Sequence, residues 1–222
     1  MKSIVLTTIL ITSLYSSGCS QSTNQKNTTS SASVKVGGGC EGCEAIYESP
    51  VAHEKLSWID TLPGFDGDGP RIEISGTIYQ RDGKTPARDV IIYVYHTNLA
   101  GVYPTRGNET GWGKRHGYIR GWIKTNDKGQ YKFYTLLPAA YPEARVPSHI
   151  HPTIKEPNLN EYWIDEYLFD DDPLVTSEDR NRRQQRGGSG ILKLIKEDGM
   201  LVGKRDIILG LNVPGYPDAT SN

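Results

Sequence analysis

Residues 71–79 read RIEISGTIY, which places Ile72, Ile74 and Ile78 on alternate positions. Side chains two residues apart on a strand point to the same face of a sheet, so this spacing predicts a strand with one buried face. The run VIIYVYH at 90–96 is continuously β-branched and aromatic. Such a run predicts a central strand that is covered on both faces. Both stretches indicate a β fold.

The rest of the chain continues this pattern. TNDKGQ at 125–130 predicts a hairpin turn, with Gly129 at the position that needs a positive φ. Further strands are expected at 130–136, 161–169, 190–195 and 205–212. Only 177–185 has a helical pattern, with Ser177 as its expected N-cap. Many short strands between Gly- and Pro-containing turns predict an all-β fold, an antiparallel β-sandwich with long loops and little helix.

The charge of the chain argues against a nucleic-acid partner. The chain has 222 residues and a formal net charge of −1. Proteins that bind nucleic acid neutralise phosphates with a basic patch or stripe, and none stands out here. The arginines between 180 and 186 share their segment with Glu178 and Asp179. We interpret that segment as a solvated surface.

The N-terminus has the layout of an export signal. One lysine precedes an apolar run from Ile4 to Leu14, and small residues lead up to Cys19. The run is too short to span a membrane. The small residues before a single cysteine resemble a bacterial lipobox, although Ser16 stands where leucine is usual. We expect residues 1–18 to be a lipoprotein-type signal peptide and Cys19 to carry a lipid, in an exported, membrane-anchored bacterial lipoprotein on the periplasmic or cell-surface side. Plain secretion is the alternative.

A polar segment follows the signal. Residues 19–39 are rich in Ser, Thr and Asn and nearly free of apolar side chains, so they predict a flexible tether. The folded domain is expected over 40–222. Cys40 and Cys43 stand at its start with C-x-x-C spacing. In an exported protein a small structural disulfide is the favoured interpretation. A thioredoxin-like redox site would need a βαβ context, and a zinc site would need two more ligands.

Two of the five histidines stand close together in VPSHIHPTI at 146–154. On a strand His149 and His151 project from one face while Ile150 faces the other way, so backbone geometry alone sets two imidazoles side by side. Copper, zinc and iron sites on β folds all use this spacing. Two unrelated half-buried imidazoles would fit the pattern too, as would a copper or zinc site beside purely structural tyrosines.

Four segments carry a family resemblance: VYHTNLAGVY (94–103), TNDKGQYKFYTLLPAAYP (125–142), PSHIH (147–151) and YLFDDDPLVTSEDR (167–180). In this order they resemble the intradiol ring-cleavage dioxygenases, the family of protocatechuate 3,4-dioxygenase and catechol 1,2-dioxygenase, over roughly residues 71–215. The resemblance implies a β-sandwich with one mononuclear Fe(III) per chain, held by two tyrosines and two histidines. Carried onto this chain, the implied ligands are Tyr103, Tyr141, His149 and His151.

The donor types suit that metal. A free phenol has a pKa of about 10, so a tyrosinate at neutral pH needs a strong nearby positive charge. Two phenolates and one hydroxide balance three positive charges, and two neutral imidazoles complete the shell. The resemblance implies a catechol and O2 as substrates, with Tyr141 and Tyr103 as catalytic residues and the Tyr141 phenolate taking up a substrate proton. The ring would be cut between its two hydroxyl-bearing carbons to give a muconate-type diacid.

The sequence departs from the family beside the histidines. The family has an arginine close to the substrate where this chain has Val146, and Arg145 comes one residue early. One step along a strand reverses the direction of a side chain. We keep Arg145 and Tyr118 as candidate substrate-binding residues, and Tyr118 is also the rival of Tyr103 as a ligand. The helical N-terminal region of catechol 1,2-dioxygenases has no counterpart, so no oligomeric state follows.

A hypothesis from another class uses the same strands. The segments GTIYQRDGKTPARDVIIYVY (76–95) and TNDKGQYKFYTLLPAAY (125–141) also resemble transthyretin-like β-sandwich modules, which bind or scaffold without a metal. The protein would then be a non-enzymatic binding module on the cell surface. Such a module gives no reason for two tyrosines and two histidines to meet, so their convergence discriminates between the two hypotheses.

Overall fold

The computed structural model describes residues 35–181 and 185–217. The expected signal peptide at 1–18, the expected lipidation site Cys19 and the tether up to residue 34 lie outside the described residues. Within the described ranges, no helix has the length and apolar character needed to cross a membrane.

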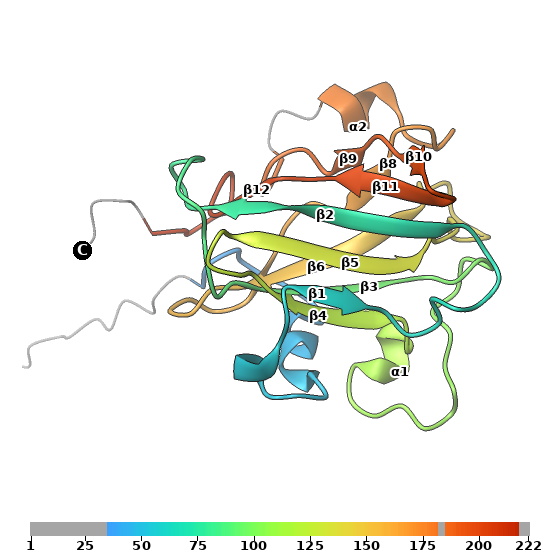
Figure 1. The fold of residues 1–222 in the computed structure, drawn as a ribbon, viewed down its shortest axis with the longest axis horizontal. Helices are drawn as coiled ribbons and strands as arrows, with labels where there is room; N and C mark the ends of the chain where they lie inside the picture. The colour runs from blue at the N-terminus through green and yellow to red at the C-terminus, as the bar shows by residue number, and fades with distance from the viewer. Residues whose placement is uncertain (1–34, 182–184, 218–222) are drawn as a thin grey trace, which may run out of the picture. The chain divides into compact units, whose positions relative to one another are not determined.

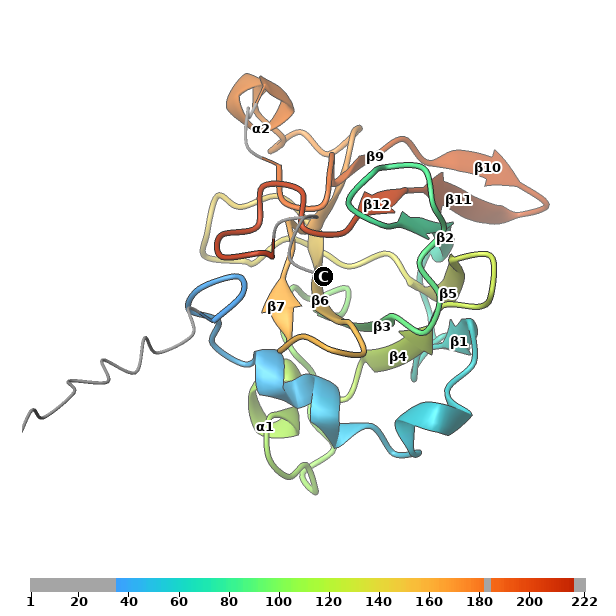
Figure 2. The same ribbon diagram turned by 90° about the vertical axis from the view of Figure 1, so that its left-hand side faces the viewer.

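Two sheets pack face to face (Figures 1 and 2). The first has the order β1 (Ile59–Thr61), β5 (Gln130–Leu136), β2 (Arg71–Tyr79), β11 (Met200–Lys204) and β10 (Ile195–Glu197), and β12 (Ile207–Ile208) also pairs with β2. The second has the order β4 (Arg120–Lys124), β3 (Ile91–His96), β6 (His149–Lys155), β8 (Tyr167–Phe169) and β9 (Ile191–Leu192), and β7 (Tyr162–Trp163) pairs with β6. The expectation of a mostly β fold is confirmed.

The expectation of a purely antiparallel sandwich is wrong, because both sheets are mixed. The pairs β2–β5, β3–β4 and β3–β6 are antiparallel. The pairs β1–β5, β2–β11, β2–β12 and β8–β9 are parallel. A tight hairpin can join only antiparallel neighbours, whereas strands joined through long connections can align either way. The parallel pairs here are joined through long connections, and the sequence pattern does not show which strands such connections bring together.

The main core lies between the two sheets. Ile72, Ile74 and Ile78 of β2 are all 0% exposed and pack in it, as the alternation in that strand predicts. On β3, Ile92 and Val94 face the same core. The other side of β3 is covered too, by a 3-10 helix, η1 (Cys43–Glu48), in a second apolar cluster. Strand β3 is therefore buried on both faces, as its continuous apolar run predicts.

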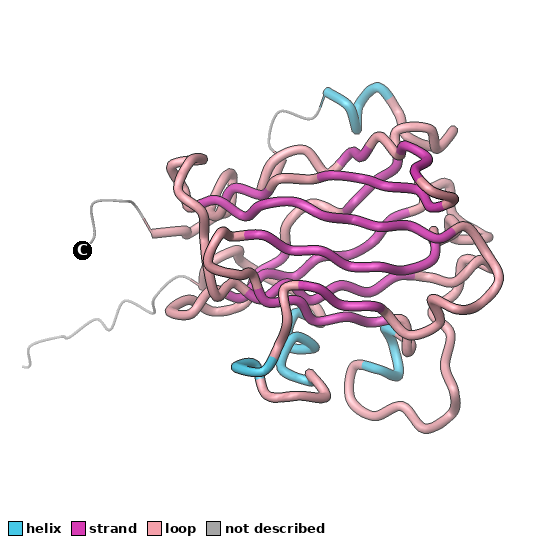
Figure 3. The backbone as a smooth tube through the Cα atoms, in the orientation of Figure 1, coloured by secondary structure: helices cyan, strands magenta, loops and turns pink. Residues whose placement is uncertain are grey.

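Within residues 35–181 and 185–217, helix is confined to short segments at the edge of the fold (Figure 3). These are α1 (Gly113–His116), α2 (Ser177–Asn181) and the 3-10 helices η1 and η2 (His53–Lys55). At the start of α2 the capping residue is Thr176 rather than Ser177, because the Asp179 amide donates to Thr176 Oγ1 at 3.2 Å while the Thr176 amide donates to Asp179 Oδ2 at 2.9 Å. Gly129 adopts φ 68° in the expected hairpin turn.

The folded body includes residues that the sequence assigned to the tether. The Gly37 amide donates to the Pro214 carbonyl at 2.7 Å, and the Val36 amide donates to Asn160 Oδ1 at 3.1 Å. Lys35 forms an ion pair with Glu161 at 2.9 Å. Composition alone missed these contacts because glycine-rich backbone can pack without apolar side chains. Just beyond, Cys40 and Cys43 are joined by a disulfide.

Candidate metal centre

Strand β6 presents the two histidines on its outer face. Ile150 points into the core between the sheets and is 0% exposed. His149 and His151 project the other way, with their Nε2 atoms 3.0 Å apart. The Ser148 amide fixes the start of the strand by donating to Asp172 Oδ2 at 2.8 Å. The period of two in PSHIH therefore produces the paired imidazoles that the sequence predicts.

The two tyrosines come from loops that pack against each other. The loop after β3 closes with Gly101 at φ 71°, and a Cβ at Gly101 would lie 2.1 Å from the Ala140 carbonyl oxygen. The Ala139 amide donates to the Asn98 carbonyl at 3.2 Å, which ties the second loop to the first. This close backbone contact places the side chains of Tyr103 and Tyr141 together, and their hydroxyl oxygens are in direct hydrogen-bond contact.

All four predicted ligand atoms meet at one point. Tyr103 Oη lies 2.9 Å from His151 Nε2, and Tyr141 Oη lies 3.4 Å from the same atom. Tyr141 Oη also lies 3.2 Å from His149 Nε2. Two ligands each about 2.1 Å from one metal ion and about 90° apart lie about 3.0 Å from each other, so these separations fit a shared ion.

The protonation of the imidazoles supports a metal at this point. His149 Nδ1–H donates to the Pro147 carbonyl at 2.6 Å, which leaves a lone pair on His149 Nε2. Burial lowers the pKa of His151 to about 3, so its ring is neutral at neutral pH. The lone pair on His149 Nε2 faces His151 Nε2 at 3.0 Å, so a cation or a proton must lie between the two nitrogens.

Ionisation of the Tyr103 phenol also requires a positive charge at this point. Burial, followed by the hydrogen bond with Tyr141, raises the pKa of the Tyr103 phenol above its usual range. Only a strong positive charge nearby would ionise it at neutral pH. No group of three or more His, Cys, Asp or Glu side chains in the described ranges could hold a metal. A metal here would therefore depend on both phenol oxygens, and the donor set fits an ion that accepts phenolate and imidazole together.

A comparison with protein families matches most of the folded part of the chain. A family model described as "Dioxygenase" matches residues 45–186. The chain belongs to the intradiol dioxygenase family.

Its relatives in the family are distant. The chain is 28% identical over 113 residues to the protocatechuate 3,4-dioxygenase beta chain of Burkholderia cepacia, which covers 48% of each protein. It is 27% identical over 141 residues to catechol 1,2-dioxygenase 1 of Acinetobacter lwoffii, covering 56% of this chain and 43% of the relative. The chain thus spans about half the length of the curated relatives that it matches.

Solved structures show the same fold. The dioxygenase domain of a dioxygenase–carbohydrate-binding fusion from Streptomyces sp. SirexAA-E superposes with a TM-score of 0.52 at 19% identity, covering 67% of this chain and 85% of that one. The catechol 1,2-dioxygenase of Acinetobacter sp. ADP1 superposes with a TM-score of 0.51 at 20% identity, covering 69% and 57%.

Tyr95 also lies at the candidate site, although its place in the aromatic and β-branched run at 90–96 predicts only strand packing. Its ring stacks on His151 with centroids 4.6 Å apart and on His116 with centroids 3.8 Å apart. Tyr95 is the cross-strand partner of His151 in the β3–β6 pairing. That pairing was the missing signal, because aromatic spacing within one strand cannot show which neighbour lies opposite.

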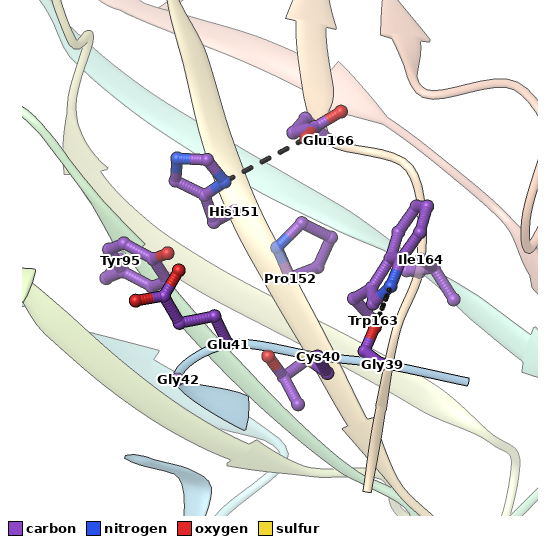
Figure 4. A pocket seen from close by; sticks show the side chains of 11 residues that line it. Gly39, Cys40, Glu41, Gly42, Tyr95, His151, Pro152, Trp163, Ile164 and Glu166 are labelled. Atoms are coloured by element: carbon purple, nitrogen blue, oxygen red, sulfur yellow. Dashed lines mark hydrogen bonds and ion pairs between the residues drawn. The ribbon is translucent and has the colours of Figure 1, made fainter. Parts of the chain in front are cut away.

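Two small pockets adjoin the candidate metal centre. One, of about 240 Å³, is lined by Tyr103, Tyr141 and His151 together with Tyr95, Trp112, Arg115, His116 and Glu41. The other, of about 260 Å³, shares Glu41, Tyr95 and His151 with the first and continues to Glu166 and the disulfide loop (Figure 4). The N-terminal segment that carries the disulfide is thus a wall of the site, which the sequence did not predict.

The two candidate substrate-binding residues lie away from both pockets. Arg145 is exposed and lines neither pocket. Tyr118 lies under the Arg106 guanidinium, 4.2 Å from its ring centroid, and lines a different pocket with Glu109 and Arg120. The rival ligand Tyr118 is therefore not among the residues that converge with the histidines, whereas Tyr103 is.

Proposed function

We propose that this protein is a non-haem Fe(III) dioxygenase that cleaves a catechol ring between its two hydroxyl-bearing carbons, using O2, to give a muconate-type diacid. The observation that carries the proposal is the convergence of two phenol oxygens and two imidazole nitrogens. Membership of the intradiol dioxygenase family supports it. A transthyretin-like module without a metal gives no reason for this convergence.

In this proposal Tyr103, Tyr141, His149 and His151 hold one iron per chain. When bound, Fe(III) supplies the positive charge that ionises the phenols and activates a chelated catechol towards O2. Tyr141 Oη then accepts a proton from one catechol hydroxyl, which is general-base work by a phenolate within the site. Tyr141 suits this role because its side chain lies on the surface loop at 138–142, half-buried and next to the pocket.

The remaining residues orient these groups. The Pro147 carbonyl fixes the His149 ring by accepting its Nδ1 proton, so His149 Nε2 stays available as a ligand. The stack of His116, Tyr95 and His151 holds the plane of the second imidazole. Tyr95 is also buried enough that the pKa of its phenol is raised, so it stays neutral and acts as a wall.

Product analysis tests the proposal. Purified protein loaded with iron is incubated with catechol, and O2 uptake and diacid formation are measured. We expect one O2 consumed per diacid formed, a fall of at least about 100-fold in kcat for Tyr141→Phe because a general base contributes about 10²–10⁴, and near-normal turnover for the matched control Tyr118→Phe. Equal losses in both variants, or no diacid from any catechol, would overturn the assignment.

We also propose that the chain is exported and anchored by a lipid on Cys19, on the periplasmic or cell-surface side. Support comes only from the N-terminal sequence, in which a short apolar run leads to a single cysteine. The test is the distribution of full-length protein between membrane and soluble fractions. Cys19→Ala should move it to the soluble fraction, and a variant that stays with the membrane would contradict the lipid anchor.

A further inference from the structure

The pockets beside the candidate metal centre contain few charges. Among the described residues, the charged side chains that line them are Glu41, Arg115 and Glu166. Glu41 and Arg115 are ion-paired to each other. Glu166 lies on the opposite side of the pocket in Figure 4, with Oε1 4.0 Å from His151 Nδ1. Two carboxylates therefore border the pockets: Glu41 is neutralised by Arg115, and Glu166 has no Lys or Arg partner among the described residues.

No cation neutralises Glu166 within the described ranges. No Lys or Arg nitrogen there lies within ion-pair distance of it, and the group that faces its carboxylate is the His151 ring, which the candidate centre uses as a ligand. Arg186 is the arginine to consider as a partner for Glu166, because its guanidinium carbon lies 3.5 Å from the ring centroid of Trp163, which lines the same pocket. Arg186 instead donates to the Gly37 carbonyl at 3.1 Å and lines neither pocket.

We propose that Glu166 makes this site select catechols whose ring substituent is cationic or uncharged, and reject catechols that carry a carboxylate. The inference rests on the proposed dioxygenase function and adds a substrate class to it. A carboxylate substituent in this pocket would face the Glu166 carboxylate, and the described pocket lining offers no free cation to receive it. Like charges at close range disfavour binding. An ammonium substituent would find a partner in the same group.

The departures in the sequence point the same way. The loop that precedes β6 places Val146 at the surface, 41% exposed, and Arg145 is exposed beside it. No cation from this loop lines either pocket. Arg115 lines the pocket next to Tyr103 and Tyr141, but Glu41 on the disulfide loop already pairs with it. The net charge of the pocket lining is thus negative.

Three catechols with matched ring substituents test the selection: 4-(2-aminoethyl)catechol, 4-ethylcatechol and 4-(2-carboxyethyl)catechol. At low ionic strength we expect kcat/KM for the amine to exceed that for the carboxylate by at least about tenfold, with the ethyl compound between them. Glu166→Gln should reduce this ratio to within about threefold. Glu41→Gln frees Arg115 and should shift the ratio towards the carboxylate. Glu197→Gln, on exposed β10, changes the net charge equally and should leave the ratio unchanged.

A binding measurement separates this inference from the proposed function. Trp112 and Trp163 line the pockets, so quenching of tryptophan fluorescence in anaerobic protein reports the Kd of each compound without turnover. If the amine binds more tightly than the carboxylate and Glu166→Gln removes this preference, charge selection is supported. If no catechol is cleaved in the same protein, only the dioxygenase function fails. Equal Kd values for amine and carboxylate, or a ratio that Glu166→Gln leaves intact, would overturn the charge selection.

Discussion

Gly101 decides whether the two tyrosines can meet. It lies at φ 71°, a backbone conformation that other residues rarely adopt, and its α-carbon sits against the Ala140 carbonyl. The spacing A-G-x-Y between Ala100 and Tyr103 is thus a packing requirement as well as a family feature. Any side chain at this position would push the first loop away from the second.

We therefore predict that Gly101→Ala weakens the site. The added methyl group would lie 2.1 Å from the Ala140 oxygen. We expect this clash to lower the free energy of unfolding by about 1–3 kcal/mol, in addition to the loss caused by placing alanine at a positive φ. Gly107→Ala is the matched control, because Gly107 has φ 89° and a methyl group added there would meet nothing within 4 Å. Urea unfolding of both variants gives the difference. Equal losses would show that the loop contact contributes nothing.

His96 shows how a buried histidine makes stability depend on pH. Its Nδ1–H donates to the Thr97 carbonyl at 2.7 Å, and Nε2 accepts from Thr135 Oγ1 at 2.7 Å. Burial lowers its pKa from 6.5 to about 4. The folded state therefore binds fewer protons than the unfolded state between these values, and the free energy of unfolding falls as the pH falls through this range.

The contribution of His96 between pH 6.5 and 4 should be on the order of 3 kcal/mol, because one pKa unit corresponds to about 1.4 kcal/mol. His96→Gln removes the titrating group. It should lower the stability at pH 7 by the loss of packing and make the pH dependence between 6.5 and 4 shallower, while other buried histidines such as His151 keep part of the slope. Urea midpoints of metal-free protein across this range provide the measurement. An unchanged slope would contradict the assignment.

At the level of the elements, the N-terminal segment has two roles. Its 3-10 helix η1 covers the outer face of β3, where Ala45 and Ile46 pack against Tyr93. The disulfide loop in front of η1 then forms a wall of the candidate site, and Thr153 Oγ1 of β6 contacts Cys43 Sγ at 3.7 Å. The disulfide therefore ties the start of the fold to the strand that carries both histidines.

Removing the Cys40–Cys43 disulfide should make the segment at 39–48 more mobile and lower the global stability only modestly. Closing such a short loop stabilises a protein by about 2 kcal/mol in the chain-entropy model. We expect Cys40→Ser with Cys43→Ser to lower the free energy of unfolding by about this amount and to make the 39–48 segment exchange amide hydrogens faster. Wild-type protein treated with a reductant should behave alike. Unchanged exchange in this segment would show that η1 packing alone holds it.

The elements also show what a sequence can predict. Strands β2, β3 and β5 match their predicted ranges because their periodicity is long and regular. The expected strand at 161–169 is broken into β7 and β8, and β4 and β11 were not predicted, because short strands with glycine carry little periodic signal. His149 and His151 follow from β geometry alone. Tyr103 and Tyr141 lie on loops, so only the family resemblance could identify them.

In the molecule as a whole, the candidate centre lies on the outer face of the second sheet. The core between the sheets takes Ile150, while the opposite face of the same strand carries both histidines. The apolar core and the polar site therefore use alternate residues of β6 and do not compete for positions. Glu41, Glu166 and Tyr95 reach the site from distant parts of the chain, and no local motif could have brought them together.

The measurement that tests the central claim is the visible absorption spectrum of purified iron-loaded protein, with metal analysis of the same sample. Tyrosinate bound to Fe(III) predicts a red-brown charge-transfer band with about one iron per chain. The band should shift or weaken in Tyr103→Phe and Tyr141→Phe and remain in Tyr118→Phe. A colourless protein that takes up no iron after anaerobic Fe(II) loading and reoxidation in air would contradict the metal centre and leave the fold as a binding module.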